Sequence, residues 1–397
     1  MSRRARWITL PNRVSWRRKR AVATLSGIKR ALAILAIAGL AGCQSTRVAP
    51  LWPGSKYTEG DRSIAMLRAL AYIDQSASKP ANFAEYGTDY VYCFYSIAAS
   101  ARDPELSGEA ERIGRRAAKR WAASHAVVTA DANADDIADL AFGWLAASQL
   151  GQDDGRIKPE LRKAAVRFTA VDYLQFDPAR EPPPSDIPEM CPHDSVWNPR
   201  GATVCKKCGR ALQMQSKYDV WLDALITSYT GDRYGIQLGA PYREVLQWTP
   251  SMRPYLDRNQ TNHAVFYDTV YAITHVVYTL NDYGQHLLPR DLLPQEYSFL
   301  KRNLREAIAL HDPETMGEFL DSLKSFGLNT SDEVIRSGMS YLLSTQRPDG
   351  TWSAPNEKDP YTLYHSAWTG IDGLKDCRWQ GEGLSFPELR PLLERMR

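Results

Sequence analysis

Three cysteines and a histidine of this 397-residue chain lie close together in sequence: Cys191, His193, Cys205 and Cys208. Three thiolates and one imidazole are a ligand set typical of a structural zinc site. One residue separates Cys191 from His193, whereas two residues separate the cysteines of a Cys-x-x-Cys pair. Asp194, which has the wider spacing, could therefore supply the fourth ligand instead of His193. Four protein ligands leave no position for a reacting water, and the pattern therefore favours a structural site over a catalytic one.

The same cysteines allow a second interpretation, in which Cys205 and Cys208 form a disulfide, as an oxidising compartment would favour. This Cys-x-x-Cys pair is followed by Gly209 and resembles half of a zinc ribbon. We therefore expect a zinc knuckle, with the disulfide as the alternative. Cys93 and Cys377 lie far from this group in sequence and are expected to be buried or unpaired.

A second set of polar residues recurs along the chain at nearly regular intervals. Successive members lie 47, 83, 49, 46 and 51 residues apart: Asp89, Asp136, Asp219, Asp268, Glu314 and His365. Each opens a helix-forming segment rich in aromatic and small residues, a composition suited to the wall of a pocket. Acids are also favoured in the first turn of any helix because they complement its positive end, so capping is the alternative for each acid taken singly.

Two of these segments carry further candidates for acid–base chemistry. In FYDTVYAITHVVYTL, Asp268 and His275 lie on one helix face, but about 10.5 Å apart along the axis, which is too far to share a metal. In DPETMGEFLDSL, Glu314 and Glu318 lie on one face and could share a proton or a metal. The alternatives are a buried structural histidine and a solvated helix face. The candidate catalytic residues are His275, Asp268, His365, Glu318, Glu314 and Asp219.

The elements that must position these residues are helices. Helical periodicity begins near Asp61 and continues through most of the chain, which predicts an all-α fold. A charged, amphipathic set of helices is expected near 61–77, 107–125, 156–174, 241–255, 294–310 and 331–345. The aromatic-rich set alternates with it, and a period of about 48 residues with two helices per unit is typical of a helical repeat array. The interval of 83 residues between Asp136 and Asp219 is the exception, and it predicts an insertion at 176–214, which contains the Cys/His group.

The segment SGMSYLLSTQRPDGTW near the C-terminus carries the clearest repeat signal. Its Gly338, Gln346, Gly350 and Trp352 match the QW motif, and in this one unit the chain resembles the squalene-cyclase and prenyltransferase repeat superfamily. The resemblance implies an (α/α)6 toroid of about six helix pairs over residues 61–397. In such a toroid the aromatic-rich helices would surround a central cavity.

Other enzyme signatures narrow the function classes. His365 in YHSAWTGIDGL resembles the zinc-ligand histidine of protein prenyltransferase β-subunits, but the Asp-x-Cys pair of those enzymes is absent, so only a pocket role is implied. Asn133-Ala134-Asp135-Asp136 lacks the first Asp of the D-x-D-D motif of class II terpenoid cyclases and is typical of a capped helix start. The sequence contains no G-x-S-x-G, Walker loop, dinucleotide fingerprint or H-E-x-x-H motif.

The first 42 residues are typical of an export signal. They hold ten of the 49 Lys and Arg residues and no acid, and they end in a short apolar run. The string LAGC, ending at Cys43, resembles the lipobox of bacterial lipoproteins, which implies that residues 1–42 are cleaved, Cys43 is diacylated and residues 43–60 form a tether. The alternative is a short buried helix. The rest of the chain is net acidic, so no nucleic-acid surface is expected.

These features together predict a lipid-anchored protein of the bacterial cell envelope that contacts the membrane through its anchor. Gln44 follows Cys43 where an Asp would retain the protein at the inner membrane, so the outer membrane facing the periplasm is favoured in a Gram-negative source. The candidate residues predict a lyase, hydrolase or cyclase that uses carboxylates and a histidine on a polar or amphiphilic substrate. The alternative is a non-catalytic scaffold or ligand-binding lipoprotein with a structural zinc.

Overall fold

The computed structural model describes residues 49–397, which fold into α-helices joined by turns and loops. Within this range there are isolated β-bridges but no strand, which confirms the prediction of an all-α chain. The predicted signal peptide (1–42), the lipidation site Cys43 and the first residues of the predicted tether lie outside the described residues. No helix between residues 49 and 397 is long and apolar enough to cross a membrane.

Two sets of helices alternate along the chain. The amphipathic set comprises α2 (Glu59–Ser78), α4 (Pro104–Ser124), α6 (Ile157–Ala165), α7 (Ala170–Leu174), α9 (Tyr242–Leu246), α10 (Thr249–Met252), α12 (Pro294–Ala309) and α14 (Glu333–Thr345). The aromatic-rich set comprises α3 (Pro80–Ser100), α5 (Ala134–Gln149), α8 (Lys217–Tyr234), α11 (His263–Leu280), α13 (Pro313–Ser325) and α15 (Pro360–Leu374). Shorter elements are η1 (Arg258–Gln260), η2 (Pro387–Leu389) and α16 (Arg390–Arg395).

Capping explains two of the differences from the predicted ranges, while the helix predicted at 241–255 is divided into α9 and α10. The helix predicted at 107–125 begins earlier, at Pro104, because the Asp103 carboxylate accepts hydrogen bonds from two N–H groups of the first turn at 2.9 and 3.3 Å. The helix predicted at 156–174 is broken into α6 and α7, because Thr169 begins a new capping box. Both changes come from short polar side chains that satisfy backbone N–H groups at a helix start.

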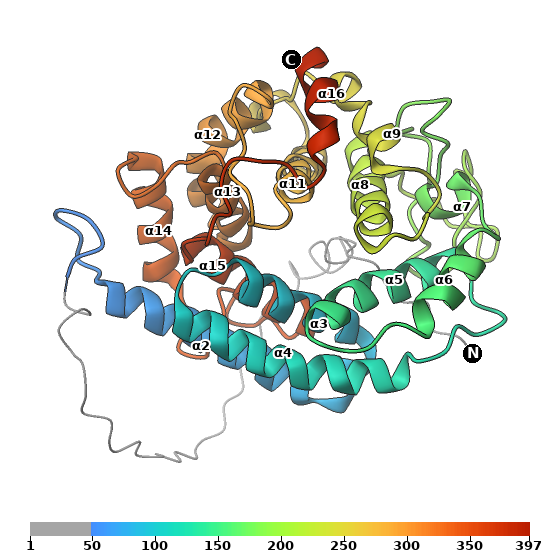
Figure 1. Ribbon diagram of the computed structural model, residues 1–397. Helices are drawn as coiled ribbons and strands as arrows, with labels where there is room; N and C mark the ends of the chain where they lie inside the picture. Colours follow the sequence, from blue (N-terminus) through green and yellow to red (C-terminus); the bar gives the residue numbers. More distant parts are fainter. Residues whose placement is uncertain (1–48) are drawn as a thin grey trace, which may run out of the picture.

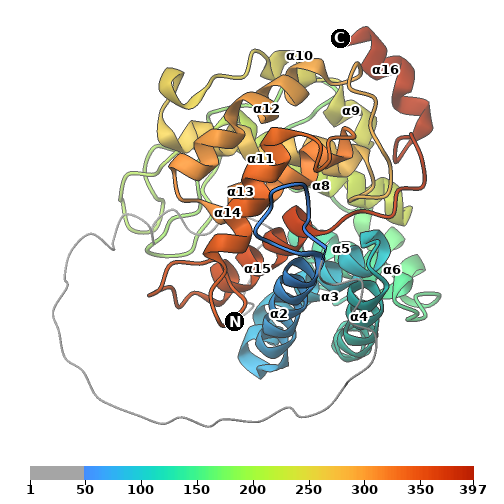
Figure 2. The ribbon, with the colours of Figure 1, turned by 90° about the vertical axis from the view of Figure 1, so that its left-hand side faces the viewer.

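The aromatic-rich helices contact one another in chain order. α3 contacts α5, α5 contacts α8, α8 contacts α11, α11 contacts α13, and α13 contacts α15. α15 also contacts α3, so the last helix of the set meets the first. Figure 1 shows amphipathic helices on the outside of this set, with α2 and α4 along one side and α12 and α14 along another. α2 and α4 also run side by side in Figure 2.

The turn after α14 joins the C-terminal part of the chain to α2. The Gln346 side-chain amide donates to the Ala65 carbonyl oxygen at 2.8 Å. Gly350 has a φ of +95°, and a Cβ at this position would lie 2.5 Å from the Arg68 carbonyl oxygen. Trp352 is buried, and its Nε1 donates to a carbonyl oxygen of α14 at 2.8 Å. The Gln, Gly and Trp of the QW-type segment therefore fix this turn and its contact with α2.

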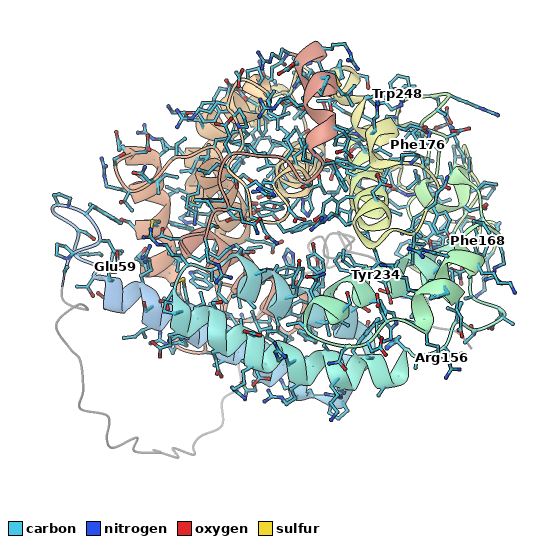
Figure 3. All side chains as sticks on the ribbon, in the orientation of Figure 1. Glu59, Arg156, Phe168, Phe176, Tyr234 and Trp248 are labelled. Atoms are coloured by element: carbon cyan, nitrogen blue, oxygen red, sulfur yellow. The ribbon has the colours of Figure 1, made fainter. Side chains whose placement is uncertain are left out.

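Residues 175–216 connect α7 to α8 and contain no helix. This range includes the predicted insertion and the Cys/His group. Phe176 is fully buried, and Trp248 Nε1 donates to the Pro178 carbonyl oxygen at 2.8 Å. Figure 3 labels Phe176 and Trp248 on the same side of the molecule. The start of the segment is thus held against the helices that follow it.

Candidate functional site

A pocket lies between α3, α11, α13 and α15. Its lining residues are Tyr92, Ser96, His275, Tyr278, Tyr283, Glu318, Asp321, His365, Trp368, Thr369, Asp372 and Lys375. Three of the predicted catalytic residues are among them: His275, Glu318 and His365. The pocket therefore combines titratable side chains with an aromatic wall, on helices that are far apart in sequence.

His365 in α15 is hydrogen-bonded to Glu314 in α13. The His365 Nδ1 lies 3.0 Å from Glu314 Oε1, and the Tyr271 hydroxyl donates to the same oxygen at 3.1 Å. Burial alone would raise the pKa of Glu314, but the charge of His365 and these two hydrogen bonds hold it below its ordinary value. Burial opposes protonation of His365, yet the Glu314 carboxylate raises the pKa of the imidazole above its ordinary value. The pair orients the ring and leaves Nε2 as its second proton-transfer atom.

Glu318 lies one helical turn after Glu314 but in a different environment. The Thr274 hydroxyl donates to its Oε2 at 2.6 Å, and the side chain is almost fully buried. Burial raises the pKa of Glu318 to about 8, although the Thr274 hydrogen bond and the charge of His365 oppose this shift. The carboxyl group is therefore protonated near neutral pH and can donate a hydrogen bond or a proton.

The neighbours of His275 determine its tautomer. Its Nδ1 lies 2.8 Å from the Tyr271 carbonyl oxygen, which can only accept a hydrogen bond. Nδ1 therefore carries the proton. Burial lowers the pKa of His275 to about 4, so the ring is neutral near pH 7 and its Nε2 holds a lone pair.

One end of the pocket holds a group of buried charges, of which the sequence pattern had placed only Asp321, on the helix face that carries Glu314 and Glu318. Lys375 Nζ lies 3.5 Å from Asp321 Oδ1 and also binds Asp372. Lys324 Nζ donates to the carbonyl oxygens of Asp372 and Gly373 at 3.0 Å each, which caps the end of α15. Burial raises the pKa of Asp372 to about 6, and the Lys375 charge opposes this shift.

Asp89 is the first member of the regularly spaced polar set. It is buried in α3, and the Tyr364 hydroxyl of α15 donates to its Oδ2 at 2.9 Å. Burial raises the pKa of Asp89 to about 6, and the Tyr364 hydrogen bond opposes this shift. The Asp89–Tyr364 contact connects two of the helices that form the pocket.

Other members of that set lie away from the pocket. Asp219 is in the first turn of α8, where its backbone N–H donates to Ser216 Oγ at 3.3 Å. Asp268 is fully buried in α11, and neither of these two residues lines the pocket. Asp136 accepts a hydrogen bond from the Asn133 N–H at 3.0 Å in the capping box of α5. Asp136 is therefore a helix-capping residue, which was the alternative to a functional role for each acid of this set.

A second candidate site lies in the segment between α7 and α8. One potential ligand atom from each of Cys191, Asp194, Cys205 and Cys208 lies within 4.8 Å of all the others, an arrangement compatible with a metal site. The cysteines are free thiols, with 3.7 Å between the sulfurs of Cys191 and Cys208. His193 is beside this group and not in it, with its Nδ1 3.2 Å from Asp194 Oδ1.

Two similar turns explain why Asp194 takes this place. Cys191 and Asp194 have the same spacing as Cys205 and Cys208. In each turn the carbonyl oxygen of the first cysteine accepts a hydrogen bond at 2.8 Å from the N–H four residues later, contributed by Ser195 or by Gly209. Ser195 and Gly209 both have a positive φ, +51° and +70°. The two turns thus bring their first and last side chains to one point, as two metal-binding knuckles would.

The pocket has the components of proton transfer, since it combines a protonated carboxyl group, an imidazole held by a carboxylate and a neutral imidazole. The Cys/Asp group has the donor set of a closed metal site. Comparisons with protein-family models, with curated proteins and with solved structures find no match for this chain.

Proposed function

We propose that this chain is an enzyme whose pocket performs general acid–base catalysis. The observation that supports the proposal best is the different protonation of two carboxyl groups one turn apart on α13. Glu314 is ionised against His365, while burial raises the pKa of Glu318 to about 8. Carboxyl groups whose environments separate their pKa values are typical of acid and base assignments in active sites.

In this proposal His365 is the general base and Glu318 the general acid. Glu314 accepts the Nδ1 proton of His365 in a hydrogen bond, so that Nε2 receives the substrate proton. The carboxylate also stabilises the imidazolium that forms, as in other histidine–carboxylate pairs. Glu318 then gives its proton to the leaving group, and the neutral His275 accepts a hydrogen bond at Nε2. Of the lyase, hydrolase and cyclase reactions, a paired acid and base suits a lyase or a hydrolase.

The proposed setting of this activity is an (α/α)6 toroid related to the squalene-cyclase and prenyltransferase repeat superfamily. The contacts from α3 through α15 and back to α3 support this arrangement, as do the QW-type contacts of Gln346 and Gly350 with α2. The lipobox-like sequence supports attachment of Cys43 to the bacterial cell envelope, with the pocket facing the periplasm. The aromatic wall suits a polar or amphiphilic substrate.

A screen of purified protein against polysaccharides, glycosides and esters, followed by mass spectrometry, would test the enzyme proposal. Hydrolysis adds the mass of one water to the products, whereas elimination does not. For a substrate that is converted, we expect Glu318→Gln and His365→Asn each to lower kcat/KM by about 100-fold or more. The pH profile should fall on the alkaline side near pH 8, where Glu318 loses its proton.

The matched control for this experiment is Glu394→Gln, since Glu394 is exposed on α16. It should leave kcat/KM unchanged. Unchanged activity in both Glu318→Gln and His365→Asn would show that the pocket is not the active site. Conversion of none of the substrate classes would contradict the proposed catalysis.

We also propose that Cys191, Asp194, Cys205 and Cys208 hold a structural zinc ion. Three thiolates and a carboxylate suit zinc, and the Lys207 N–H close to the Cys205 sulfur, at 3.4 Å, would stabilise a metal-bound thiolate. Four protein ligands leave no open position, so this metal would hold the segment in place and take no part in the reaction.

Metal analysis of matched variants would test this ligand set. Wild-type protein should contain one zinc per chain, and Asp194→Ala should lose most of it and melt at a lower temperature. His193→Ala is the control, because its ring lies outside the group of four. Equal zinc content in Asp194→Ala and wild type, or loss of zinc only in His193→Ala, would contradict the assignment.

A further inference from the structure

Two sulfur atoms of the Cys/Asp group are in contact across its two turns. Cys191 Sγ, from the first turn, lies 3.7 Å from Cys208 Sγ, from the second. The Cys205 sulfur lies within 4.8 Å of both, but it accepts a hydrogen bond from the Lys207 N–H at 3.4 Å and is 3.9 Å from Asp194 Oδ2. A disulfide bond is about 2.0 Å long, so the sulfurs of Cys191 and Cys208 are about 1.7 Å from bonding distance.

The three cysteines differ in exposure, which sets the order in which they meet an oxidant from solution. Cys191 and Cys205 are buried, with exposed fractions of 0% and 2%, whereas Cys208 is only partly buried. An external oxidant therefore reacts first with the Cys208 sulfur, because reactivity follows access. The sulfur in contact with Cys208 is that of Cys191, which is placed to react next.

We infer that, without bound metal, this group is oxidised to a disulfide between Cys191 and Cys208, while Cys205 remains a thiol. The oxidant is a small-molecule disulfide. Cys208 loses its proton and attacks one sulfur of the oxidant, whose S–S bond breaks and releases one thiol that takes up the proton. Cys191 then attacks the Cys208 sulfur of this mixed disulfide, and the second oxidant thiol leaves with the Cys191 proton. Two protein thiols are oxidised, and one external disulfide is reduced to two thiols.

This cross-link differs from the disulfide that the Cys-x-x-Cys spacing predicts as an alternative. A bond between Cys205 and Cys208 would stay within one turn, whereas a bond between Cys191 and Cys208 joins the two turns and closes a longer loop, which stabilises a folded segment more. Two sulfurs bonded to each other cannot both bind one zinc ion, so the metal and the cross-link exclude each other. Either of them holds the two turns together. The inference goes beyond the proposed function, because the oxidised chain needs neither zinc nor catalysis.

Peptide mapping of the purified full chain would test this inference without any substitution. The protein is freed of metal with EDTA, oxidised with glutathione disulfide, alkylated at its remaining thiols and digested with trypsin in the absence of reductant. Trypsin cleaves after Arg and Lys, which places the three cysteines on separate peptides, 181–200, 201–206 and 208–210. We expect 181–200 to be linked to 208–210, and 201–206 to be alkylated. Protein loaded with zinc should form this link about tenfold more slowly or less.

Cys205→Ser and Cys191→Ser are the matched variants, since each removes one of the two buried thiols. Cys205→Ser should form the same link at the wild-type rate, whereas Cys191→Ser should accumulate glutathione on 208–210. The inference is overturned if 201–206 is the peptide linked to 208–210, if the two variants behave alike, or if zinc-loaded and metal-free protein are linked equally fast. Absence of zinc from the wild-type chain would count against the proposed zinc site alone, whereas zinc binding without the expected link in metal-free protein would count against this inference alone.

Discussion

The protonation states of Glu314, Glu318 and His365 are set by different neighbours within one pocket. Glu314 has two hydrogen-bond donors, which lower its pKa, and its carboxylate in turn raises the pKa of His365. Glu318 has only the Thr274 hydroxyl and little solvent, so its neutral form is favoured. Beside the ion pairs of Lys375, the pocket therefore combines a histidine–carboxylate pair with a neutral acid, which is cheaper than burying an additional unpaired charge.

The raised pKa of Glu318 predicts a pH dependence of stability. Its folded pKa of about 8 exceeds the ordinary value of 4.5, so the folded state binds this proton more tightly than the unfolded state. The contribution is fully present below about pH 4.5 and is lost as the pH rises through about 8. Glu318→Gln, which mimics the neutral acid, should therefore gain stability relative to wild type between pH 5 and pH 8, by about 4 kcal/mol. Urea unfolding at several pH values measures this difference.

Glu394→Gln serves again as the reference, because an exposed carboxyl group should give a stability difference that hardly changes over this pH range. A Glu318→Gln protein whose stability differs from wild type by the same amount at pH 5 and pH 8 would show that Glu318 titrates normally.

At the level of single residues, the sequence could identify those that combine an unusual type with a helix position. His275, Glu318 and His365 were predicted from their places on the aromatic-rich helices, and all three line the pocket. Lys375 was not found, because a lysine at the end of a helix is usually solvated, and its burial depends on contacts with another helix. Asp194 could be named only as an alternative to His193, because the shape of the turn decides between them.

At the level of helices, the close approach of α13 to α15 places Glu314 beside His365. Gly317 makes this approach possible, because a Cβ at this position would lie 2.2 Å from the Thr369 carbonyl oxygen. Gly373 meets Gly317 from the other helix, where an added Cβ would lie 2.8 Å from the Gly317 Cα. Gly317 and Gly373 therefore allow the close packing of α13 against α15 on which the pocket depends.

Gly317→Ala should separate α13 from α15 and destabilise the protein by more than about 2 kcal/mol, because backbone must move to remove the overlap. The Glu314–His365 pair should loosen, which would lower the pKa of His365, measurable by NMR titration of the histidine rings. Gly108→Ala is the matched control: Gly108 lies in helix α4 with no atom within 4 Å of an added Cβ. It should stabilise the protein by about 0.5–1 kcal/mol through helix propensity. Similar effects of the two substitutions would contradict this account.

The sequence pattern predicted the order and kind of the long helices well, since periodicity and aromatic content distinguish α3, α11 and α15 from their charged neighbours. Boundaries were less accurate because they depend on individual caps, such as Asp103 before α4 and Thr169 before α7. The break between α6 and α7 was missed for that reason. Helix–helix distances could not be predicted at all, because the roles of Gly317 and Gly373 follow from three-dimensional contacts.

At the level of the whole molecule, contacts between the two ends of the described chain close the arrangement. α15 packs against both α2 and α3, and Gln346 binds a carbonyl oxygen of α2 across 281 residues of sequence. The pocket depends on this closure, because it takes Tyr92 and Ser96 from α3 and its histidines from α11 and α15. Weakening the contacts between α2 and the C-terminal part of the chain should therefore loosen the pocket as well as the surface.

Gly350→Ala tests this dependence. The substitution places a Cβ 2.5 Å from the Arg68 carbonyl oxygen at a position with a φ of +95°, so it should weaken the attachment of α2 and destabilise the protein by about 2 kcal/mol or more. Gly54→Ala is the control, because Gly54 has a similar φ of +81° but no atom within 4 Å of an added Cβ. Hydrogen exchange measured by mass spectrometry should show faster exchange in α2 and α15 for Gly350→Ala only. Equal exchange in the two variants would mean that backbone strain alone is responsible and that the junction does not hold the two ends together.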